Sequence, residues 1–354
     1  MTKIGIPTER KTKEGRIALT PYAVAELVAA GHEVFIESKA GELSGFYDEE
    51  YAQVGAQIVP DQASLYGQSD LIVKVKEPID EDLQFIEARH TLFCYLHLAA
   101  LPELTQKLQD IGCTAIAFET VSEGPGQGLP LLTPMSIIAG RIAVLMGVNQ
   151  LGASQGGRGT LLGGIPSIHT GKVVVIGAGV AGAESAAVAA RLGAQVVVFD
   201  KKTEALTRAR QLGDNVTALA SYQQLIAEEI KNADLVIGAV LIPGAKAPKV
   251  MTREMVRTMP KGSVLVDIAI DQGGCIETVK PTTYEAPAFE DEGVMHIGVT
   301  NMPGAYPRSS TLALSAAISP YVLRLCANGL EDQAILAGLN IQAGEIKLEA
   351  LMEC

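Results

Sequence analysis

The sequence predicts an α/β fold made of two doubly wound domains, each a largely parallel β-sheet with helices packed on it. Strand-like and helix-like stretches alternate along most of the chain, which is the pattern of successive βαβ units. The 354 residues are enough for two domains of about 150 residues each. The chain is also 48% hydrophobic, 19% charged and rich in glycine, as expected for many buried strands joined by tight turns.

The first part of the chain shows this alternation clearly. A helix near 21–30 lies between two apolar stretches, and a second helix at 102–109 precedes the last strand of the region. The loop 122–130 is rich in the glycine and proline that interrupt regular structure, and it predicts a hinge or a domain boundary. The expected strands are 3–6, 33–37, 71–76, 91–96 and 113–117.

The second part begins with residues 135–151, which have the length and apolar density of a long buried helix with Ser136 as its N-cap. A helical stretch through 320–327 is expected to pack back onto the first domain. The predicted domains are therefore 1–130 with 308–354, and 131–307, with a cleft between them. The strands expected in the second domain are 172–176, 195–199, 235–239 and 263–270.

The composition argues against several classes of protein. A net charge of −12 repels the phosphate backbone of nucleic acids, so a nucleic-acid partner is not expected. No stretch reaches the roughly 18 uninterrupted apolar residues that a membrane-spanning helix needs, so no membrane partner is expected either. The positive mean hydropathy of +0.24 is attributed to short buried strands and to contacts between subunits, which predicts an oligomer.

The cysteines are five in number, are scattered along the chain and include no Cys-x-x-Cys pair. A disulfide framework or a structural zinc site is therefore not expected. The N-terminus has neither a long apolar core nor a cleavage signature. Together these features predict a reduced, cytoplasmic location and no metal.

A glycine-rich turn carries the strongest functional signal. In a Gly-x-Gly-x-x-Gly pattern the first glycine permits a tight turn, the second lets the backbone approach a pyrophosphate, and the third allows a helix to pack closely on a strand. The helix N-terminus then binds the phosphates. The apolar run 173–176 leads into this pattern, an alanine-rich helix at 183–192 follows it, and its residues are Gly177, Ala178, Gly179, Val180, Ala181 and Gly182. The pattern predicts a Rossmann-type dinucleotide site.

Asp200 decides between the two nicotinamide cofactors. It follows the next predicted strand, at the place where an acidic side chain binds the ribose hydroxyls of adenosine. A carboxylate there repels the additional phosphate of NADP, so the predicted cofactor is NAD, a preference that the neighbouring Lys201 and Lys202 soften. The alternative is a plain strand–turn–helix unit with a surface aspartate.

Three further candidate groups lie at the ends of predicted strands, and ligands of open α/β sheets bind beyond the carboxyl ends of strands. Lys74 and Lys76 share one face, where they either anchor a substrate carboxylate or carbonyl or extend to solvent. His97 is either a general acid/base or a satisfied core histidine. Asp271 is either catalytic or caps a turn, whereas Asp267 lies within the strand in a buried structural role.

Many collinear strings resemble bacterial L-alanine dehydrogenases over essentially the whole chain. In the first half the matching segments are 5–9, 16–21, 74–78, 96–99, 132–136 and 155–159. In the second half they are 173–179, 237–249, 267–274 and 301–303. The resemblance implies an oxidoreductase that reversibly deaminates L-alanine to pyruvate and ammonium with NAD as its cofactor.

The resemblance also implies roles for individual residues. Arg16 would bind the substrate carboxylate, and Lys76 would bind the substrate carboxylate or carbonyl oxygen. His97 and Asp271 would be the catalytic acid/base groups, one of which activates the water that adds to the imine. Met135 would line the substrate site. Contacts with the cofactor would come from Ser136, Ser221, Val240, Leu241, Ile268, Asp271, Asn301 and Met302.

Two other functions stay open at this point. The soluble subunit of proton-translocating transhydrogenase shares the fold and several strings, but that family lacks the lysine and the histidine that stand here as Lys76 and His97. A non-catalytic NAD-binding protein would keep the glycine turn without keeping Arg16, Lys76, His97 and Asp271 together. Alanine dehydrogenases form hexamers, so the resemblance also implies a homohexamer.

Overall fold

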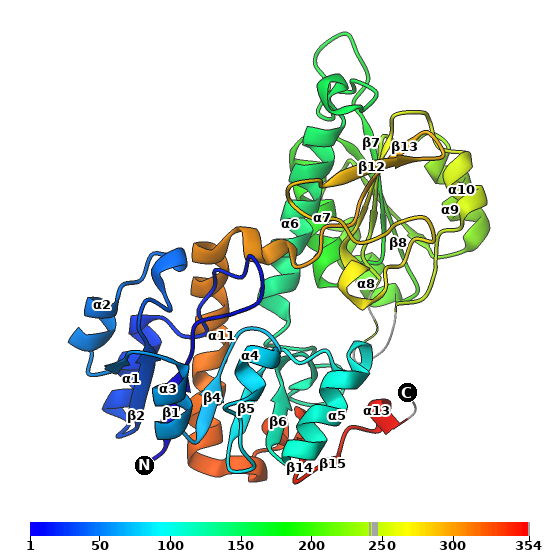
Figure 1. The fold of residues 1–354 in the computed structure, drawn as a ribbon. Coiled ribbons are helices and arrows are strands. Elements are labelled where there is room, and N and C mark those ends of the chain that lie inside the picture. Colours follow the sequence, from blue (N-terminus) through cyan, green and yellow to red (C-terminus); the bar gives the residue numbers. More distant parts are fainter. Residues whose placement is uncertain (241, 243–246, 353–354) are drawn as a thin grey trace. The chain divides into compact units, whose positions relative to one another are not determined.

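The computed structural model describes residues 1–240, 242 and 247–352, and Figure 1 shows its fold. The chain divides into two compact units. Unit 1 contains residues 1–135 and the described residues from 303 onward, and unit 2 contains the described residues from 136 to 302. The divisions fall at 135 and 302, each five residues from the expected boundaries at 130 and 307. Each unit has a mainly parallel sheet with helices packed on it, which confirms the predicted fold class.

Unit 1 contains an eight-stranded sheet with the order β15-β14-β6-β5-β4-β1-β2-β3. Strands β1 to β6 pair in parallel, whereas β14 runs antiparallel to β6 and to β15. The C-terminal segment therefore completes the sheet that the N-terminal segment begins. The strands are β1 Lys3–Ile6, β2 Glu33–Glu37, β3 Gln57–Val59, β4 Leu71–Val73, β5 Thr91–Cys94, β6 Thr114–Ala117, β14 Leu339–Gln342 and β15 Glu345–Ile346.

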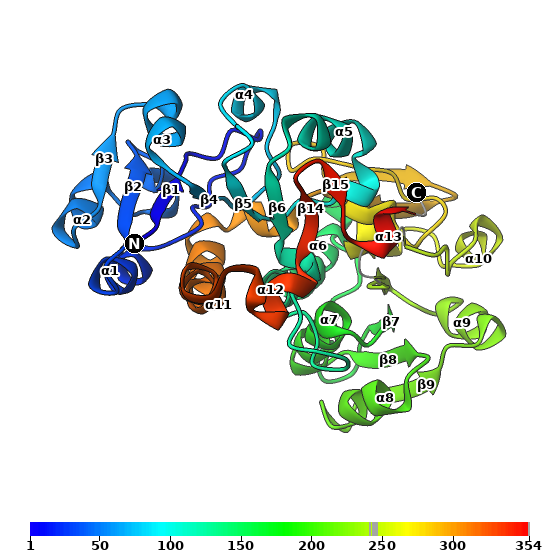
Figure 2. The same ribbon diagram turned by 90° about the horizontal axis from the view of Figure 1, so that it is seen from below.

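Helices cover both faces of this sheet, with α1, α11 and α12 on one side and α3, α4 and α5 on the other (Figure 2). Proline stands in the first turn of α1, α5 and α11, where its fixed φ suits a helix and its missing N–H leaves no bond unmade. The helices are α1 Pro21–Ala29, α2 Asp48–Gln53, α3 Gln62–Gln68, α4 Asp80–Leu83, α5 Pro102–Ile111, α11 Pro307–Asn328, α12 Gln333–Ala337 and α13 Glu349–Met352. Short 3-10 helices are η1 Glu42–Ser44, η2 Leu98–Ala100, η3 Phe118–Thr120, η6 Met302–Ala305 and η7 Gly329–Glu331.

α11 is the one helix of the described residues that is long and apolar enough to cross a membrane by length and composition, over Pro307–Glu331. Within unit 1 it makes the contacts of a core helix. Thr311 Oγ1 accepts a hydrogen bond from the Ile17 N–H at 3.0 Å, and Ser315 Oγ accepts one from the Thr20 N–H at 2.9 Å. Core helices of this kind pass the same test of length and composition, so α11 is weak evidence for a membrane span.

Unit 2 contains a seven-stranded sheet with the order β12-β13-β11-β10-β7-β8-β9, parallel throughout except for the edge strand β12. Successive valines of β7 alternate between its two faces, as a fully buried strand requires. Val173 and Val175 belong to one core, and Val174 and Ile176 belong to the other. The strands are β7 Lys172–Ile176, β8 Gln195–Asp200, β9 Val216–Ala220, β10 Leu235–Gly238, β11 Val264–Asp267, β12 Ala288–Asp291 and β13 Val294–Ile297.

The helices of unit 2 pack on these two cores. Residues of α6, α7 and α8 join the core of Val173, and residues of α9 and α10 join the core of Val174. The helices are α6 Thr133–Gln150, α7 Val180–Arg191, α8 Thr203–Arg210, α9 Gln223–Ile230 and α10 Arg253–Arg257, with 3-10 helices η4 Ala153–Gln155 and η5 Ile268–Gln272.

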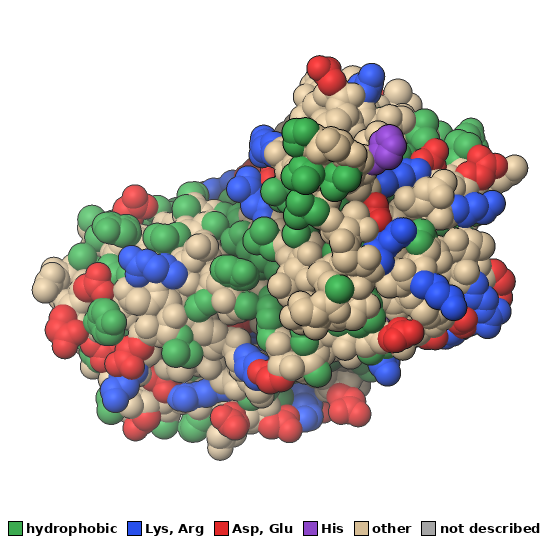
Figure 3. Space-filling view, turned by 90° about the horizontal axis from the view of Figure 1, so that it is seen from above, with side chains coloured by type: hydrophobic (Ala, Val, Ile, Leu, Met, Phe, Trp, Pro, Cys, Tyr) green, Lys and Arg blue, Asp and Glu red, His purple; other side chains and the backbone are tan. Residues whose placement is uncertain are grey.

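Several large apolar side chains of unit 2 stay on the surface. Leu145 of α6 is 52% exposed, and Leu161, Ile165 and Ile168 in the following segment are between 55% and 60% exposed. Figure 3 shows hydrophobic side chains gathered beside an exposed histidine on the face that carries this segment. We call these four residues the apolar patch.

Several sequence-based expectations about element ends were wrong, and three of these differences have a clear local cause. β11 stops at Asp267 instead of Ile270, because the Asp267 carboxylate accepts the Ala269 N–H at 2.9 Å and so starts η5. β4 stops at Val73 instead of Lys76, because the N–H groups of Val75 and Lys76 bond to a glutamate described below. α6 begins at Thr133, where Pro134 fits the first turn, so Ser136 lies inside the helix and is not its N-cap.

Candidate functional site

The strand order of unit 2 places a ligand site at one edge of its sheet. Read from β9 through β8, β7, β10 and β11 to β13, the order reverses between β7 and β10, and nucleotides bind at the carboxyl ends of strands beside such a reversal. The predicted cofactor residues that the structure describes lie at the ends of strands of this sheet, in the segments that follow these strands, or near the start of α6. The glycine turn follows β7, Ser221 follows β9, Val240 follows β10, Ile268 and Asp271 follow β11, Asn301 and Met302 follow β13, Asp200 ends β8, and Ser136 lies in α6.

The glycine turn has the geometry that each glycine was predicted to provide. Gly177 has φ +101°, and a Cβ there would lie 2.6 Å from the Ala239 carbonyl oxygen. A Cβ on Gly182 would lie 1.8 Å from the Gly177 carbonyl oxygen, so only glycine lets α7 approach the turn. A Cβ on Gly179 would meet nothing within 4 Å, which leaves open space in front of the helix N-terminus for a phosphate.

α7 begins at Val180 with Gly179 as its N-cap residue, three residues before the expected start at 183. The N–H groups at this end therefore belong to the turn itself, where a pyrophosphate would accept them. The turn and the open space before it fit a dinucleotide.

Asp200, at the end of β8, accepts hydrogen bonds from three segments at the carboxyl edge of this sheet. Its carboxylate accepts the Ala178 N–H at 2.7 Å and the Lys202 N–H at 2.8 Å. Its backbone carbonyl accepts the Ser221 N–H at 3.0 Å, which ties the end of β9 to the end of β8. Because each carboxylate oxygen has two lone pairs, Asp200 keeps acceptor capacity for ribose hydroxyls.

The segment after β11 carries Asp271 and is held by two charged residues. The buried Asp267 accepts the N–H groups of Ala269, Cys275 and Ile276 at 2.9, 2.8 and 2.9 Å, which agrees with its predicted structural role. Lys249 Nζ donates to the carbonyls of Gly273, Gly274 and Ile276 at 2.8, 2.9 and 3.2 Å. Lys249 was not predicted as a site residue, although it lies in one of the matching strings.

Asp271 itself is exposed and lies in η5, not at the exit of a strand. Its two carboxylate oxygens accept the Asn301 N–H at 3.2 and 3.1 Å, and Asn301 has φ +52°. Unit 2 therefore brings Asp271 and Asn301 together. Met302 is buried in the core of unit 2, and the predicted cofactor residue Leu241 lies outside the described residues.

Unit 1 repeats the arrangement with different side chains. Its strand order from β3 through β2, β1, β4 and β5 to β6 reverses between β1 and β4. The loop after β1 carries Arg16, the segment after β4 carries Lys76, and the segment after β5 carries His97. Three predicted substrate and catalytic residues thus lie at the ends of three adjacent strands.

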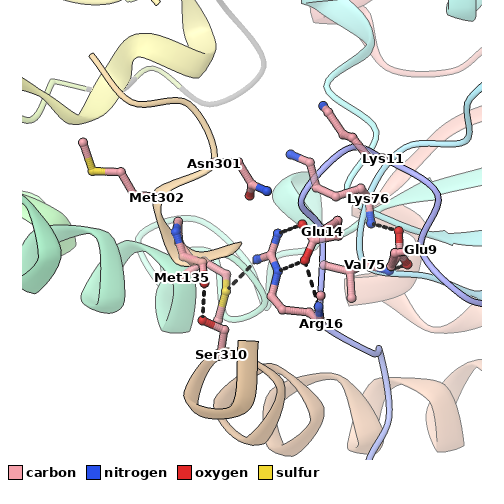
Figure 4. A network of polar contacts seen from close by, with 12 residues as sticks. Glu9, Lys11, Glu14, Arg16, Val75, Lys76, Met135, Asn301, Met302 and Ser310 are labelled. Atoms are coloured by element: carbon pink, nitrogen blue, oxygen red, sulfur yellow. Dashed lines mark hydrogen bonds and ion pairs between the residues drawn. The ribbon is translucent and has the colours of Figure 1, made fainter. Parts of the chain in front are cut away.

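Arg16 is buried and forms a bidentate ion pair with Glu14, whose carboxylate accepts from Nε at 2.6 Å and from Nη2 at 2.5 Å (Figure 4). Its Nη1 lies 3.1 Å from the sulfur of Met135, so the structure brings these two predicted residues together. Burial disfavours the charged guanidinium, but the Glu14 carboxylate outweighs burial and raises the pKa of Arg16. Arg16 is therefore a fixed cation, and Glu14 is a partner that the sequence did not reveal.

The two lysines of the Lys-Val-Lys string have different surroundings. Lys74 is 1% exposed, and its Nζ lies 3.2 Å from Asp82 and 3.5 Å from Glu9, so the interpretation of a lysine reaching solvent was wrong. Burial disfavours its charge, but these carboxylates outweigh burial and raise the pKa of Lys74. Lys76 lies 3.7 Å from Glu77.

Glu77 interacts electrostatically with three basic side chains. Burial would raise its pKa, but the charges of Lys76, Lys11 and His97 outweigh burial, and the pKa of Glu77 is lowered. Glu77 is therefore an ionised carboxylate beside Lys76.

His97 lies in the left-handed region with φ +51°, which is uncommon for a residue with a side chain. Glu119 holds it there: the carboxylate accepts the His97 N–H at 2.6 Å and the Leu96 N–H at 3.2 Å, and it lies 3.8 Å from His97 Nδ1. The imidazole stacks on Tyr95 with a centroid distance of 5.9 Å and keeps 19% of its side-chain surface exposed. A partly accessible imidazole beside a carboxylate is the arrangement of a general acid/base.

Two family models match the chain. Residues 5–139 match the N-terminal domain of alanine dehydrogenase/PNT, and residues 143–349 match the C-terminal domain of alanine dehydrogenase/PNT. Alanine dehydrogenase of Bacillus subtilis (strain 168) is 47% identical over 358 residues, which cover 98% of this chain and 93% of that protein.

Solved structures give the same result. An L-alanine dehydrogenase has a TM-score of 0.92 and 48% identity, covering 99% of this chain and 98% of that chain. A transhydrogenase from Sinorhizobium meliloti has a TM-score of 0.84 and 27% identity, covering 98% of this chain and 99% of that chain. The fold is thus shared by both, and the sequence is more similar to the first.

Proposed function

The chain belongs to the alanine dehydrogenase/PNT family, and from that premise we propose that it catalyses the reversible oxidative deamination of L-alanine to pyruvate and ammonium with NAD. The observation that carries the proposal is its identity of 47–48% with alanine dehydrogenases over nearly the whole chain. All four residues that the proposal requires are present: Arg16, Lys76 and His97 lie in segments that follow strands of unit 1, and Asp271 lies in η5 after β11. In the proposal, unit 1 is the substrate domain and unit 2 is the NAD-binding domain.

NAD would be held by unit 2. The N–H groups at the start of α7 would bind the pyrophosphate, and Asp200 would accept hydrogen bonds from the adenosine ribose. Ser221, Val240, Ile268, Asn301 and Met302 would surround the rest of the cofactor. When bound, NAD supplies the hydride acceptor for the α-carbon of alanine.

The substrate would be held by unit 1. Arg16 binds the carboxylate of alanine as a buried cation, Lys76 binds the carboxylate or the carbonyl oxygen of pyruvate, and Met135 lines the site. The bidentate pair with Glu14 and the contact of Nη1 with Met135 hold the guanidinium in one orientation.

His97 and Asp271 would move the protons of the reaction. Loss of hydride from the amine form of alanine leaves an iminium ion, and water must lose a proton to add to it. The resulting carbinolamine gains a proton on nitrogen and loses its hydroxyl proton as the C–N bond breaks. Pyruvate and ammonia are released, and the ammonia takes up a proton to become ammonium. His97, held by Glu119, and Asp271, held by the Asn301 N–H, are the groups available for these transfers.

Assembly and location belong to the same proposal. A homohexamer would cover the exposed side chains of the apolar patch, which are Leu145, Leu161, Ile165 and Ile168. Cys94, Cys113, Cys275 and Cys326 are free thiols, which suits a cytoplasmic protein. The molar mass in solution, measured by light scattering, tests the hexamer.

The experiment that tests the activity is a spectrophotometric assay. Purified protein mixed with NAD and L-alanine should produce NADH, and no amino-acid-dependent reduction would refute the proposal. The transhydrogenase alternative predicts instead that the protein binds NADH and is silent with alanine. His97→Ala and Asp271→Asn should each abolish turnover and leave NADH binding intact, which separates the enzyme from a non-catalytic NAD-binding protein.

A further inference from the structure

Glu9 has no role in the reaction proposed above, yet its carboxylate contacts the segment that carries Lys76. Oε1 accepts the Val75 N–H at 2.6 Å, and Oε2 accepts the Lys76 N–H at 3.2 Å (Figure 4). Glu9 follows β1 and Lys76 follows β4, so these bonds join the two strand ends on either side of the reversal in strand order. A single carboxylate thus replaces the sheet as the acceptor for two successive backbone donors.

The contact is buried and charged. The side chain of Glu9 is 2% exposed and that of Lys74 is 1% exposed, with Lys74 Nζ 3.5 Å from Glu9 Oε2. The same ammonium lies 3.2 Å from Asp82, whose carboxylate also accepts the Ile79 N–H at 3.0 Å. Burial raises the pKa of Glu9, whereas the Lys74 charge and the Val75 N–H lower it. Both oxygens of Glu9 accept backbone N–H groups beside the Lys74 counter-charge, and hydrogen bonds to a buried carboxylate are stronger than those between neutral groups.

The consequence falls on Lys76. Its backbone nitrogen is fixed by Glu9, while its side chain extends away from that carboxylate (Figure 4). Without Glu9, the N–H groups of Val75 and Lys76 would lose their acceptor in a buried place, and the segment would have to move to find another. A displacement of about 1 Å is enough to weaken a group that must hold a substrate in one geometry.

We infer that Glu9, whose charge is paired with that of Lys74, is a positioning residue that fixes the backbone of Lys76 in the substrate site. The inference rests on the proposed function, because it assumes that Lys76 binds the substrate. The same arrangement occurs after the neighbouring strand β5, where Glu119 accepts the N–H groups of Leu96 and His97. Both proposed substrate-contacting groups of these strands are thus held through their backbones by buried carboxylates from neighbouring strand ends.

Glu9→Gln tests the inference with little change in shape. An amide offers one acceptor oxygen instead of two, and its NH2 group would face a backbone donor and an ammonium. We expect kcat/KM for L-alanine and for pyruvate to fall about 10- to 100-fold, as for the loss of one or two charge-assisted hydrogen bonds. The Kd for NADH should stay within about twofold, because the proposed cofactor residues belong to unit 2. Glu9→Asp keeps the charge beside Lys74 but shortens the reach to the backbone, so it should fold and lose kcat/KM as well.

Asp332→Asn is the matched control. Asp332 is also a carboxylate that accepts two successive N–H groups, from Ala334 at 3.0 Å and Ile335 at 3.2 Å, and pairs with a cation, Arg324. It caps α12 and does not touch the strand ends that carry the proposed site. This variant should lose thermal stability and keep the kcat/KM of the wild type.

A double-mutant cycle separates positioning from a general structural effect. If Glu9 acts through Lys76, Glu9→Gln should cost little further affinity for pyruvate in the complex with NADH once Lys76→Met is present. Independent losses in the double variant, or wild-type kcat/KM in both Glu9 variants, would overturn the inference. A wild-type protein without alanine-dependent NAD reduction would instead refute the proposed function.

Discussion

The glycine turn gives a prediction in which two glycines of the same turn, Gly179 and Gly182, respond differently to the same added methyl group. In Gly182→Ala the new Cβ would lie 1.8 Å from the Gly177 carbonyl oxygen, about 1.6 Å closer than the shortest ordinary contact of 3.4 Å. In Gly179→Ala the new Cβ would meet nothing within 4 Å, and the backbone at φ −65° and ψ −170° suits any residue. The first change strains the fold, and the second occupies only the space in front of the helix.

The magnitudes follow from these contacts. The obstacle at Gly182 is backbone, which moves only if α7 moves, so overpacking should cost about 3 kcal/mol of the free energy of unfolding. In a unit of this size that corresponds to a fall in Tm of about 6–12 °C. Gly179→Ala should change the free energy of unfolding by less than about 1 kcal/mol. It should weaken NADH binding about 10- to 100-fold, because the methyl group takes the place of a phosphate.

Thermal unfolding without ligand and titration of NADH fluorescence measure the two effects separately. Gly179→Ala should unfold like the wild type and bind NADH poorly. Gly182→Ala should unfold earlier. A Gly179→Ala variant with wild-type affinity would refute the placement of the pyrophosphate at this turn, and a Gly182→Ala variant with an unchanged Tm would refute the steric argument.

Three further predictions concern charge, position and pH. Asp200→Asn should raise kcat/KM for NADP relative to NAD about tenfold, because it removes the repulsion of the additional phosphate. Glu119→Gln should lower kcat about 10- to 100-fold with unchanged NADH affinity, because the amide no longer holds the left-handed backbone of His97. The pKa of His90 is lowered below 6.5, chiefly by burial, and its Nδ1 accepts the Glu87 N–H at 2.8 Å, so the folded state keeps this ring neutral. Its contribution to stability is complete above pH 6.5 and is lost as the pH falls through the folded pKa, so the free energy of unfolding should drop on acidification and His90→Asn should flatten that dependence.

Each of these has a clear contrary result. An Asp200→Asn protein as selective for NAD as the wild type would show that another group excludes NADP. A Glu119→Gln protein with full kcat would show that the His97 backbone needs no acceptor. Equal slopes of stability against pH in wild type and His90→Asn, measured by urea unfolding, would assign the acid sensitivity to other groups.

Local pattern alone predicted much of the fold, and two of its errors share one cause. β1, β2 and β7 have the predicted bounds, because apolar β-branched runs between turns report directly on buried parallel strands. β4 and β11 end early because side chains, Glu9 and Asp267, take over as hydrogen-bond partners of the backbone. The periodicity of apolar residues does not show where a side chain will compete with the sheet for backbone hydrogen bonds.

The candidate site also has features that could be predicted from the sequence and features that could not. The glycine turn and Asp200 were predictable, because strand, turn and helix are consecutive and their spacing is itself the geometry of phosphate binding. Glu14, Glu119 and Lys249 were not singled out. Glu119 and Lys249 each act on a segment that the fold brings to them, and no spacing rule connects a side chain after one strand to a backbone group after another. Glu14 is only two residues from Arg16, but the pair depends on the shape of a loop, which no periodic pattern predicts.

By itself, then, the sequence determined the class of fold, the dinucleotide turn and the residue types at the strand ends, since these depend on neighbours along the chain. Only the tertiary structure decided the surroundings of the charged residues. Lys74 looked like the equal of Lys76, and the fold made it the buried counter-charge of Glu9 and Asp82. The physical reason is desolvation: a charge taken out of water must find its partner in three dimensions, and that partner lies wherever the strand order places it.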